Sequence, residues 1–367
     1  MQSTYRAAAI LVAATGLFAS TSTRADIVIG VAGPMSGQYA SGGEQMRNGV
    51  EAAAAAINAS GGVLGQKLKV EVGDDACDPK QAVSVANAMV NKKVSAIVGH
   101  YCSSSTIPAS EVYSESQIPV ITGSTNDKIT DRGLNNIFRV TGRDGQQGAV
   151  AADYFAKKFS GKKVAVVDDK SAYGKGLADV VARHLAGAGM APALRDSITA
   201  GEKDYSALIS KLKADGVDVL FYGGYYTEVG LILRQAAQAG LKLQVMGGDT
   251  LTSAELVAAA GPALDGLLFT FLPDPRKSPA SFEVVKQFRD KKIEPEGYVL
   301  FSYASVQIYA QALERARSLT YADVQKALAR GDFNTVLGKV DFDAKGDPKN
   351  PGFVVYQWKG GQYDVIK

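Results

Sequence analysis

Four consecutive hydroxyl side chains, from Ser103 to Thr106, follow an apolar run that ends near Val98. This change from apolar to small polar residues is typical of a buried strand that leads into a turn and a helix. The free N–H groups at a helix start, together with adjacent hydroxyls, bind a carboxylate well. We expect one of the four hydroxyls to cap the helix. Four in a row exceed what capping requires, so the stretch is a candidate anion site.

A second stretch of the same kind follows about twenty residues later, where an apolar run ends in Gly123, Ser124 and Thr125. In an open α/β sheet, the carboxyl ends of neighbouring strands outline the binding crevice. We therefore expect both turns to face one ligand. The alternative, two independent polar turns, stays open on these grounds alone.

The second half of the chain offers Tyr173, Tyr225 and Asp249, each at the expected end of a strand. Tyrosine combines a large apolar ring with a polar tip, and the neighbouring glycines would let a ligand approach closely. Asp249 supplies a negative charge to which an ammonium group could bind. The tyrosines could instead simply cover the strand ends.

Phosphate-loop, zinc-protease, C-x-x-C and nucleophile-elbow motifs do not occur in the sequence. Gly174-Lys175-Gly176 lacks the third glycine of a dinucleotide-binding loop and is interpreted as a helix start. The only histidines are His100 and His184, and we expect no metal and no cofactor. A hydrolase with Ser103 as nucleophile and His100 as base stays an alternative, although the sequence supplies neither an orienting acid nor an oxyanion hole. We expect a protein that is not an enzyme.

The elements that must position these residues alternate between short β-branched runs and longer amphipathic segments. This alternation predicts parallel sheets that are covered by helices on both faces. The predicted strand and helix pairs are residues 27–31 and 44–58, 68–72 and 80–91, 95–98 and 107–114, 164–167 and 176–187, and 217–222 and 228–239, followed by strands 243–246 and 267–271, helices 279–291 and 298–316, and strand-like runs near 340–342 and 354–358. The length favours two lobes, and the lack of a flexible linker favours several crossovers that act as a hinge.

The first 25 residues have the pattern of a secretory signal peptide, with Arg6 before a short apolar run and cleavage expected after Ala25. Removing Arg6 and Arg24 lowers Lys plus Arg from 40 to 38, against 37 Asp plus Glu. This balance argues against a nucleic-acid partner, because there is no excess of basic charge.

The two cysteines, Cys77 and Cys102, should form a disulfide in an oxidising compartment. No cysteine stands at the expected cleavage site, so we expect a protein that is free in the periplasm rather than lipid-anchored.

Several stretches closely resemble the leucine/isoleucine/valine-binding proteins of bacterial ABC importers. The matching stretches are residues 74–83, 102–106, 199–208, 221–225 and 342–348. The resemblance spans the chain after the signal peptide and implies a type I periplasmic-binding-protein fold, an α/β fold in which two doubly wound parallel-sheet lobes are joined by three crossovers. The implied N-terminal lobe is residues 26–143 plus 273–351, and the implied C-terminal lobe is residues 144–272 plus 352–367.

The resemblance also implies roles for the ligand-binding residues. Ser103 would bind the ligand carboxylate, and Thr125 would bridge the carboxylate and ammonium groups of the ligand. The backbone carbonyl of Gly123 or Ser124 would accept a hydrogen bond from the ammonium group. Tyr173, Tyr225 and Asp249 would complete the site from the other lobe. The expected function is capture of a free amino acid, branched-chain or another small aliphatic one, for delivery to an ABC permease by a monomer. The alternative is a sensor of amides or other small solutes.

Three positions depart from the family pattern. Asp249 stands where the family usually has Glu, Gly42 stands where an aromatic residue is common, and Tyr298-Val299 replaces a small residue followed by Phe. We expect Tyr39 to substitute for the aromatic residue that Gly42 lacks. A difference of one methylene discriminates between ligands by only about 1–3 kcal/mol, so the preferred side chain is left open.

Overall fold

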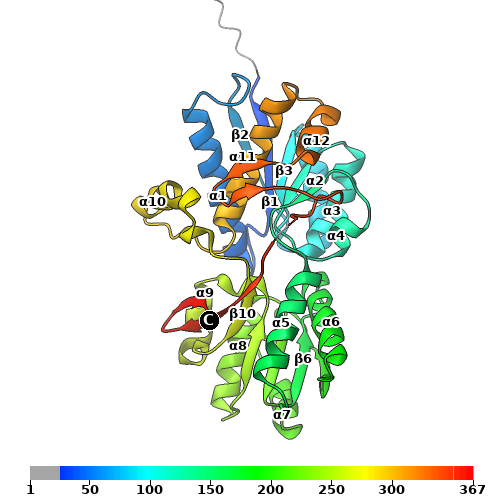
Figure 1. The fold of residues 1–367 in the computed structure, drawn as a ribbon, viewed down its shortest axis with the longest axis vertical. Helices are drawn as coiled ribbons and strands as arrows, with labels where there is room; N and C mark the ends of the chain where they lie inside the picture. Colours follow the sequence, from blue (N-terminus) through cyan, green and yellow to red (C-terminus); the bar gives the residue numbers. More distant parts are fainter. Residues whose placement is uncertain (1–24, 350, 367) are drawn as a thin grey trace, which may run out of the picture.

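The computed structural model describes residues 25–349 and 351–366, which form two lobes stacked along the long axis of the molecule (Figure 1). The predicted signal peptide lies outside the described residues apart from Ala25. Within the described part of the chain, no helix combines the length and the apolar character that crossing a bilayer requires.

The N-terminal lobe is built on a five-stranded parallel sheet with the order β2-β1-β3-β4-β5. Its strands are β1 (Ile27–Gly33), β2 (Leu68–Asp74), β3 (Ala96–Gly99), β4 (Val120–Thr122) and β5 (Ile137–Arg139). The inner strands are apolar except for Thr122 at the end of β4, because helices cover both faces. The carboxyl ends of β3 and β4 meet at one edge of the sheet, and the two hydroxyl-rich turns follow them.

Helices from two separate parts of the chain belong to this lobe. They are α1 (Ala40–Ala59), α2 (Pro79–Asn91), α3 (Ser103–Glu115), α4 (Lys128–Asp131), α10 (Phe282–Asp290), α11 (Val299–Ala316) and α12 (Tyr321–Ala329). α1 packs directly on α11. A Cβ atom on Gly49 of α1 would come within 2.1 Å of the Val299 carbonyl oxygen, so glycine is what allows the two helix backbones to approach. A short hairpin, β11 (Phe333–Thr335) and β12 (Gly338–Val340), follows α12.

The C-terminal lobe is built on a seven-stranded sheet with the order β14-β13-β10-β9-β8-β6-β7. Its strands are β6 (Val164–Asp168), β7 (Leu194–Ser197), β8 (Val219–Gly223), β9 (Gln244–Gly247), β10 (Leu268–Phe271), β13 (Val354–Lys359) and β14 (Gln362–Val365). Its helices are α5 (Asp144–Lys158), α6 (Ala172–Gly187), α7 (Ser206–Ala214), α8 (Tyr226–Gln238) and α9 (Glu255–Ala260). β13 pairs antiparallel with both β10 and β14, so this otherwise parallel sheet has an antiparallel edge that the sequence pattern did not indicate.

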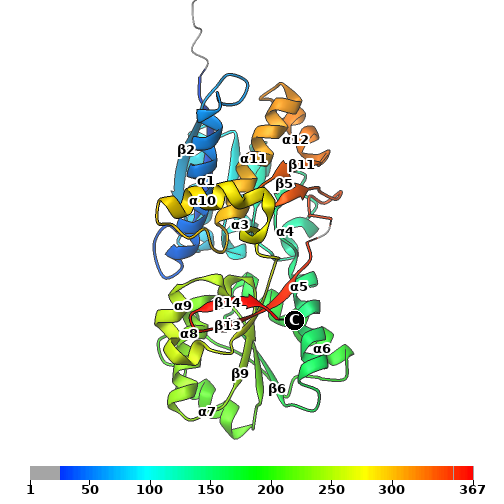
Figure 2. The same cartoon turned by 60° about the vertical axis from the view of Figure 1, so that its left-hand side comes forward.

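The chain crosses between the lobes three times, between β5 and α5, after β10, and before β13 (Figures 1 and 2). Two 3-10 helices, η3 (Pro275–Lys277) and η4 (Pro279–Ser281), follow the second crossover, and two others, η1 (Asp249–Thr252) and η2 (Gly261–Leu264), lie between β9 and β10. The predicted lobe boundaries after residues 143, 272 and 351 fall in the three crossovers and stay a prediction.

A buried ion pair lies beside two of the crossovers. Arg139, at the end of β5, bonds Asp347 (Nε to Oδ1, 2.7 Å), and both side chains are almost completely shielded from solvent. Arg143 also reaches Asp347 (Nη1 to Oδ2, 3.2 Å). The segment before the third crossover is thus tied to the first crossover.

Candidate functional site

All seven residues predicted to contact a ligand line one pocket between the lobes. The lining residues are Tyr101, Ser103, Gly123, Ser124, Thr125, Tyr173, Tyr225, Asp249, Thr250 and Tyr298. The cavity among them is about 10 Å³, roughly the space for one water molecule. The two turns of the N-terminal lobe therefore do face one site, together with strand ends of the C-terminal lobe.

The first turn begins helix α3, and Ser103 is the first residue of that helix rather than its cap. The N-cap is Cys102, which makes no side-chain capping bond. The expectation that one of the four hydroxyls caps the helix is therefore wrong, because the helix begins four residues earlier than predicted and the hydroxyls lie within its first turn. Ser103 is buried, and its Oγ accepts a hydrogen bond from the Asn126 N–H (3.4 Å), so the two turns contact each other.

The side chain of Ser124 fixes the second turn to the first. Its Oγ lies 2.9 Å from the carbonyl oxygens of His100 and Tyr101 and 2.7 Å from Thr106 Oγ1. Its own carbonyl oxygen accepts a hydrogen bond from Arg139 Nη1 (2.5 Å). The neighbouring Gly123 carbonyl accepts a hydrogen bond from the neutral Thr141 hydroxyl (3.0 Å). The Ser124 hydroxyl is thus occupied in joining the turns.

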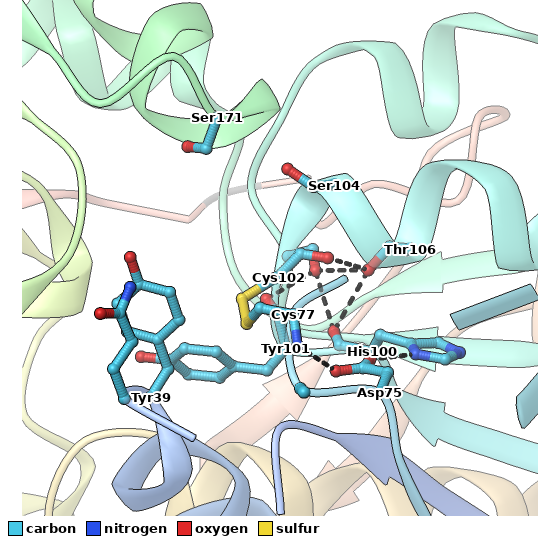
Figure 3. The surroundings of a disulfide bond; sticks show 12 residues. Tyr39, Asp75, Cys77, His100, Tyr101, Cys102, Ser104, Thr106 and Ser171 are labelled. Carbon is cyan, nitrogen blue, oxygen red and sulfur yellow. Dashed lines mark hydrogen bonds and ion pairs between the residues drawn. A yellow bond between two sulfur atoms is a disulfide. The ribbon is translucent and has the colours of Figure 1, made fainter. Parts of the chain in front are cut away.

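Behind the first turn, the Cys77–Cys102 disulfide and a buried polar cluster hold the turn in place (Figure 3). The predicted disulfide is confirmed. Asp75 accepts a hydrogen bond from the Cys77 N–H (2.8 Å) and contacts His100 Nδ1 (2.5 Å).

The second ring nitrogen of His100 contacts the Tyr113 hydroxyl (3.1 Å). Asp75 is an acid that orients the histidine, which the sequence alone did not reveal. Both ring nitrogens are therefore occupied by residues other than Ser103, and the nucleophile–base contact of the hydrolase alternative is not formed.

Asp249 is the charged centre of the pocket. Oδ1 accepts hydrogen bonds from Tyr173 Oη (2.8 Å) and Gln147 Nε2 (2.7 Å), and Oδ2 accepts one from the Tyr298 hydroxyl. Burial raises the pKa of Asp249, and these three hydrogen bonds oppose the rise by stabilising the ionised form. A cation placed beside this carboxylate would compensate for its lost hydration.

Aromatic rings form the walls of the pocket. The ring of Tyr225 lies 5.3 Å from that of Tyr173 and 6.2 Å from that of Tyr101, between ring centroids. The ring of Tyr298 lies 5.2 Å from Tyr101, edge to face. Four tyrosines, two from each lobe, therefore enclose the site.

The ring that fills the space beside Gly42 is Tyr101. A Cβ atom on Gly42 would come within 2.6 Å of Tyr101 Cζ. The expectation that Tyr39 takes this place is wrong, because the ring of Tyr39 lies against that of Tyr225 (4.4 Å between centroids, tilted by 35°) and its hydroxyl reaches Glu228 Oε1 (3.2 Å).

Tyr101, Thr250, Tyr298 and Gln147 belong to the site but were not among the predicted ligand residues. Tyr101 and Thr250 each lie next to predicted turns, so their position in the sequence was a usable signal. Gln147 lies on helix α5, which the pattern of apolar residues did not reveal. Among residues 25–349 and 351–366, no cluster of three His, Cys, Asp or Glu side chains could hold a metal ion.

A family model described as "Periplasmic binding protein" matches residues 26–362. The chain belongs to the periplasmic binding protein family. This periplasmic binding protein is 48% identical over 348 residues to Leu/Ile/Val-binding protein homolog 1 of Brucella melitensis, covering 94% of each chain. It is 43% identical over 344 residues to the leucine-, isoleucine-, valine-, threonine-, and alanine-binding protein of Pseudomonas aeruginosa, covering 93% of this chain and 92% of that one.

Two solved structures have the same architecture. A leucine-binding protein from Thermotoga maritima matches with a TM-score of 0.85 and 28% identity, over 93% of this chain and 98% of that one. A branched-chain amino acid transporter substrate-binding protein from Streptococcus pneumoniae, solved with isoleucine, matches with a TM-score of 0.85 and 27% identity, over 93% and 99%. The predicted type I periplasmic-binding-protein fold is confirmed for this periplasmic binding protein.

Proposed function

We propose that this protein is the periplasmic component of an amino-acid ABC importer and that it captures a free amino acid without chemical change. One observation carries the proposal: a turn rich in hydroxyls and helix N–H groups on one lobe and a buried carboxylate on the other line the same pocket. These are the partners that the two charged ends of an amino acid need. The names of the relatives support the same ligand class.

In this proposal the ligand carboxylate binds at Ser103 and Thr125, and the ammonium binds at Asp249. Of the two carbonyls considered for the ammonium, Gly123 is the better candidate. Ser124 already accepts from the cationic Arg139, whereas Gly123 accepts only from the neutral Thr141 hydroxyl among the contacts of the described residues. Tyr173 and Tyr225 close the site from the C-terminal lobe.

The pocket walls favour a small side chain. The lining residues, Tyr101 and Tyr298 among them, enclose a cavity of about 10 Å³, so any amino acid must first separate the lobes or move Tyr298 from Asp249. Each extra methylene must then displace an aromatic ring rather than enter free space. We therefore expect binding to weaken as the ligand side chain grows.

Binding closes the lobes because only the closed form brings Ser103 and Asp249 to the same ligand. The closed protein then docks on an ABC permease. We further propose that the protein works as a monomer in the periplasm after cleavage behind Ala25, which mass spectrometry of protein purified from the periplasm would test.

Calorimetric titration with all α-amino acids, 4-aminobutyrate and short amides tests the function. The expected result is binding of small aliphatic amino acids, with weaker or no binding of amides. Heat with amides alone would support the sensor alternative. Turnover of an ester or amide that is lost in Ser103→Ala would support a hydrolase, whereas the importer component loses binding in this variant and turns nothing over.

A further inference from the structure

One residue of the C-terminal lobe, Ala172, is held by the N-terminal lobe on both of its backbone polar groups. Its N–H donates to Ser104 Oγ (3.1 Å), and its carbonyl oxygen accepts from Asn126 Nδ2 (2.6 Å). Ala172 is the first residue of α6 and precedes the pocket residue Tyr173. Two hydrogen bonds thus join the lobes directly beside the ligand pocket.

Asn126 is presented for this contact by its own surroundings. Its Oδ1 accepts a hydrogen bond from the Lys128 N–H (2.9 Å), so the amide nitrogen is turned toward α6. Its backbone carbonyl accepts hydrogen bonds from both terminal nitrogens of the buried Arg139 (3.2 and 3.3 Å). The side chain is therefore held from two sides before the lobes meet.

Gly176 provides the space that Asn126 enters. A Cβ atom at position 176 would lie 2.4 Å from Asn126 Nδ2, which is closer than a carbon and a nitrogen can approach. This contact explains the glycine in Gly174-Lys175-Gly176, a segment whose sequence indicated only a helix start. A glycine inside a helix lowers helix stability, so its presence there favours a role in lobe contact.

The Ser104 hydroxyl, which accepts the hydrogen bond from Ala172, is separate from the disulfide and its buried polar cluster. Figure 3 shows the Ser104 side chain pointing away from Cys77 and Cys102, toward the start of α6, where Ser171 is drawn. Ser104, Asn126 and Gly176 lie outside the set of described residues that line the pocket.

We propose that Ser104, Asn126 and Gly176 form an interlobe latch that stabilises the closed form without contacting the ligand. Ligand affinity depends on the fraction of protein that can reach the closed form, so a contact made only in that form raises affinity. Its loss multiplies every dissociation constant by the same factor. The loss of a pocket contact instead affects some ligands more than others.

Ser104→Ala and Gly176→Ala test the latch from opposite lobes. The matched controls are Ser105→Ala, whose hydroxyl is buried without a partner, and Gly187→Ala, at the other end of α6, where a Cβ meets nothing within 4 Å. Another interlobe bond, from Tyr39 to Glu228, is less suitable for this test because the Tyr39 ring also contacts the pocket residue Tyr225.

The readout is the dissociation constant for alanine, valine and leucine by calorimetry. Both latch variants should raise the dissociation constants of all three ligands by one common factor of about three- to tenfold, which is the net effect of one hydrogen bond. The controls should stay within about twofold of the wild type. A loss that differs between ligands, or no loss in either latch variant, overturns the latch.

The ligand readout rests on the proposed function, so a second measurement is independent of it. Small-angle scattering is measured without ligand and with the amino acid that binds most tightly. In at least one of these conditions, Gly176→Ala should have a larger radius of gyration than both the wild type and Gly187→Ala. A wild type that binds no amino acid refutes the proposed function. An unchanged radius in every condition measured refutes the latch, whether or not an amino acid binds.

Discussion

The ring of Tyr101 lies beside Gly42, so close that a Cβ atom on Gly42 would come within 2.6 Å of Tyr101 Cζ. Gly42 has no side chain, and the ring of Tyr101 fills the space that a side chain at this position would occupy. The same ring contacts Tyr225 and Tyr298, so Tyr101 limits the size of the pocket from the N-terminal lobe.

Replacing Tyr101 with Ala should enlarge the pocket and shift preference toward larger side chains. We expect leucine to gain affinity relative to alanine by up to about 50-fold, since leucine has three more side-chain carbons than alanine and each buried one contributes about 0.8 kcal/mol. Competition binding with both ligands measures the ratio. Tyr101→Phe, which keeps the ring, is the control. An unchanged ratio in Tyr101→Ala would show that another residue limits the ligand.

Replacing Asp249 with Asn should weaken amino-acid binding by about 30-fold or more, because a buried charge pair loses one partner. Asp249→Glu keeps the charge and should retain most of the affinity. Calorimetry on the three proteins checks both statements. If Asp249→Asn and the wild type bind with equal affinity, Asp249 does not bind the ammonium group.

Amino-acid binding should also weaken as pH falls. Burial raises the pKa of Asp249, and only its ionised form pairs with an ammonium group. Below that pKa, affinity should fall by about tenfold for each pH unit, since binding then requires release of a proton. Titrations across the acidic range measure the slope, and in Asp249→Asn the slope should be absent.

Asp169 should make the folded protein less stable as pH rises. Burial raises its pKa from 3.8 to about 6, so between these values the folded protein holds a proton that the unfolded chain releases. The free energy of unfolding should therefore fall by about 3 kcal/mol through this window and level off above it. Urea unfolding of wild type and Asp169→Asn at both ends of the window checks this. An identical pH dependence in the two proteins would contradict it.

Breaking the buried ion pair between Arg139 and Asp347 should cost about 3–5 kcal/mol, because Asp347 then keeps only its longer contact with Arg143 and the carbonyl oxygens of Ser124 and Asn126 lose their donor. Arg139→Met is the variant, measured by denaturant unfolding. Arg139→Met combined with Asp347→Leu removes both charges and should recover much of the stability. If the double variant is less stable than Arg139→Met, the buried Asp347 carboxylate stabilises the fold even without Arg139, and the prediction is wrong.

Reduction of the disulfide, or Cys77→Ala with Cys102→Ala, should lower the free energy of unfolding by about 3 kcal/mol, from the loop-closure entropy of 25 residues. Because Cys102 immediately precedes Ser103, ligand affinity should fall as well. Unfolding curves with and without a reductant measure the first effect, and titrations under the same conditions measure the second. The cysteine-free variant should not respond to the reductant.

The sequence was sufficient to predict which turns line the pocket, and the reason is local. Parallel strands bring their carboxyl ends to one edge, so polar residues directly after β3 and β4 had to lie together. Ser103 and Thr125 follow from that rule. The same rule placed Tyr225 and Asp249 after β8 and β9.

Contacts that depend on the relative placement of distant segments could not be predicted in this way. Gln147 reaches Asp249 from a helix in the first third of the C-terminal lobe, and no pattern near either residue indicates it. The position of the Tyr101 ring, in the space that a side chain at Gly42 would occupy, depends on packing between α1 and the turn after β3. The antiparallel edge of the second sheet depends on where β13 returns after the third crossover.

The packing of α1 on α11 also sets an order of events during synthesis. The whole C-terminal lobe sheet up to β10 is made between these two helices, so the N-terminal lobe cannot complete its core while it emerges from the ribosome. Its folding must wait for contacts between segments far apart in the chain, which slows folding. A polypeptide that stays unfolded for longer remains able to pass through a secretion channel. The interleaved chain path is therefore well suited to export before folding.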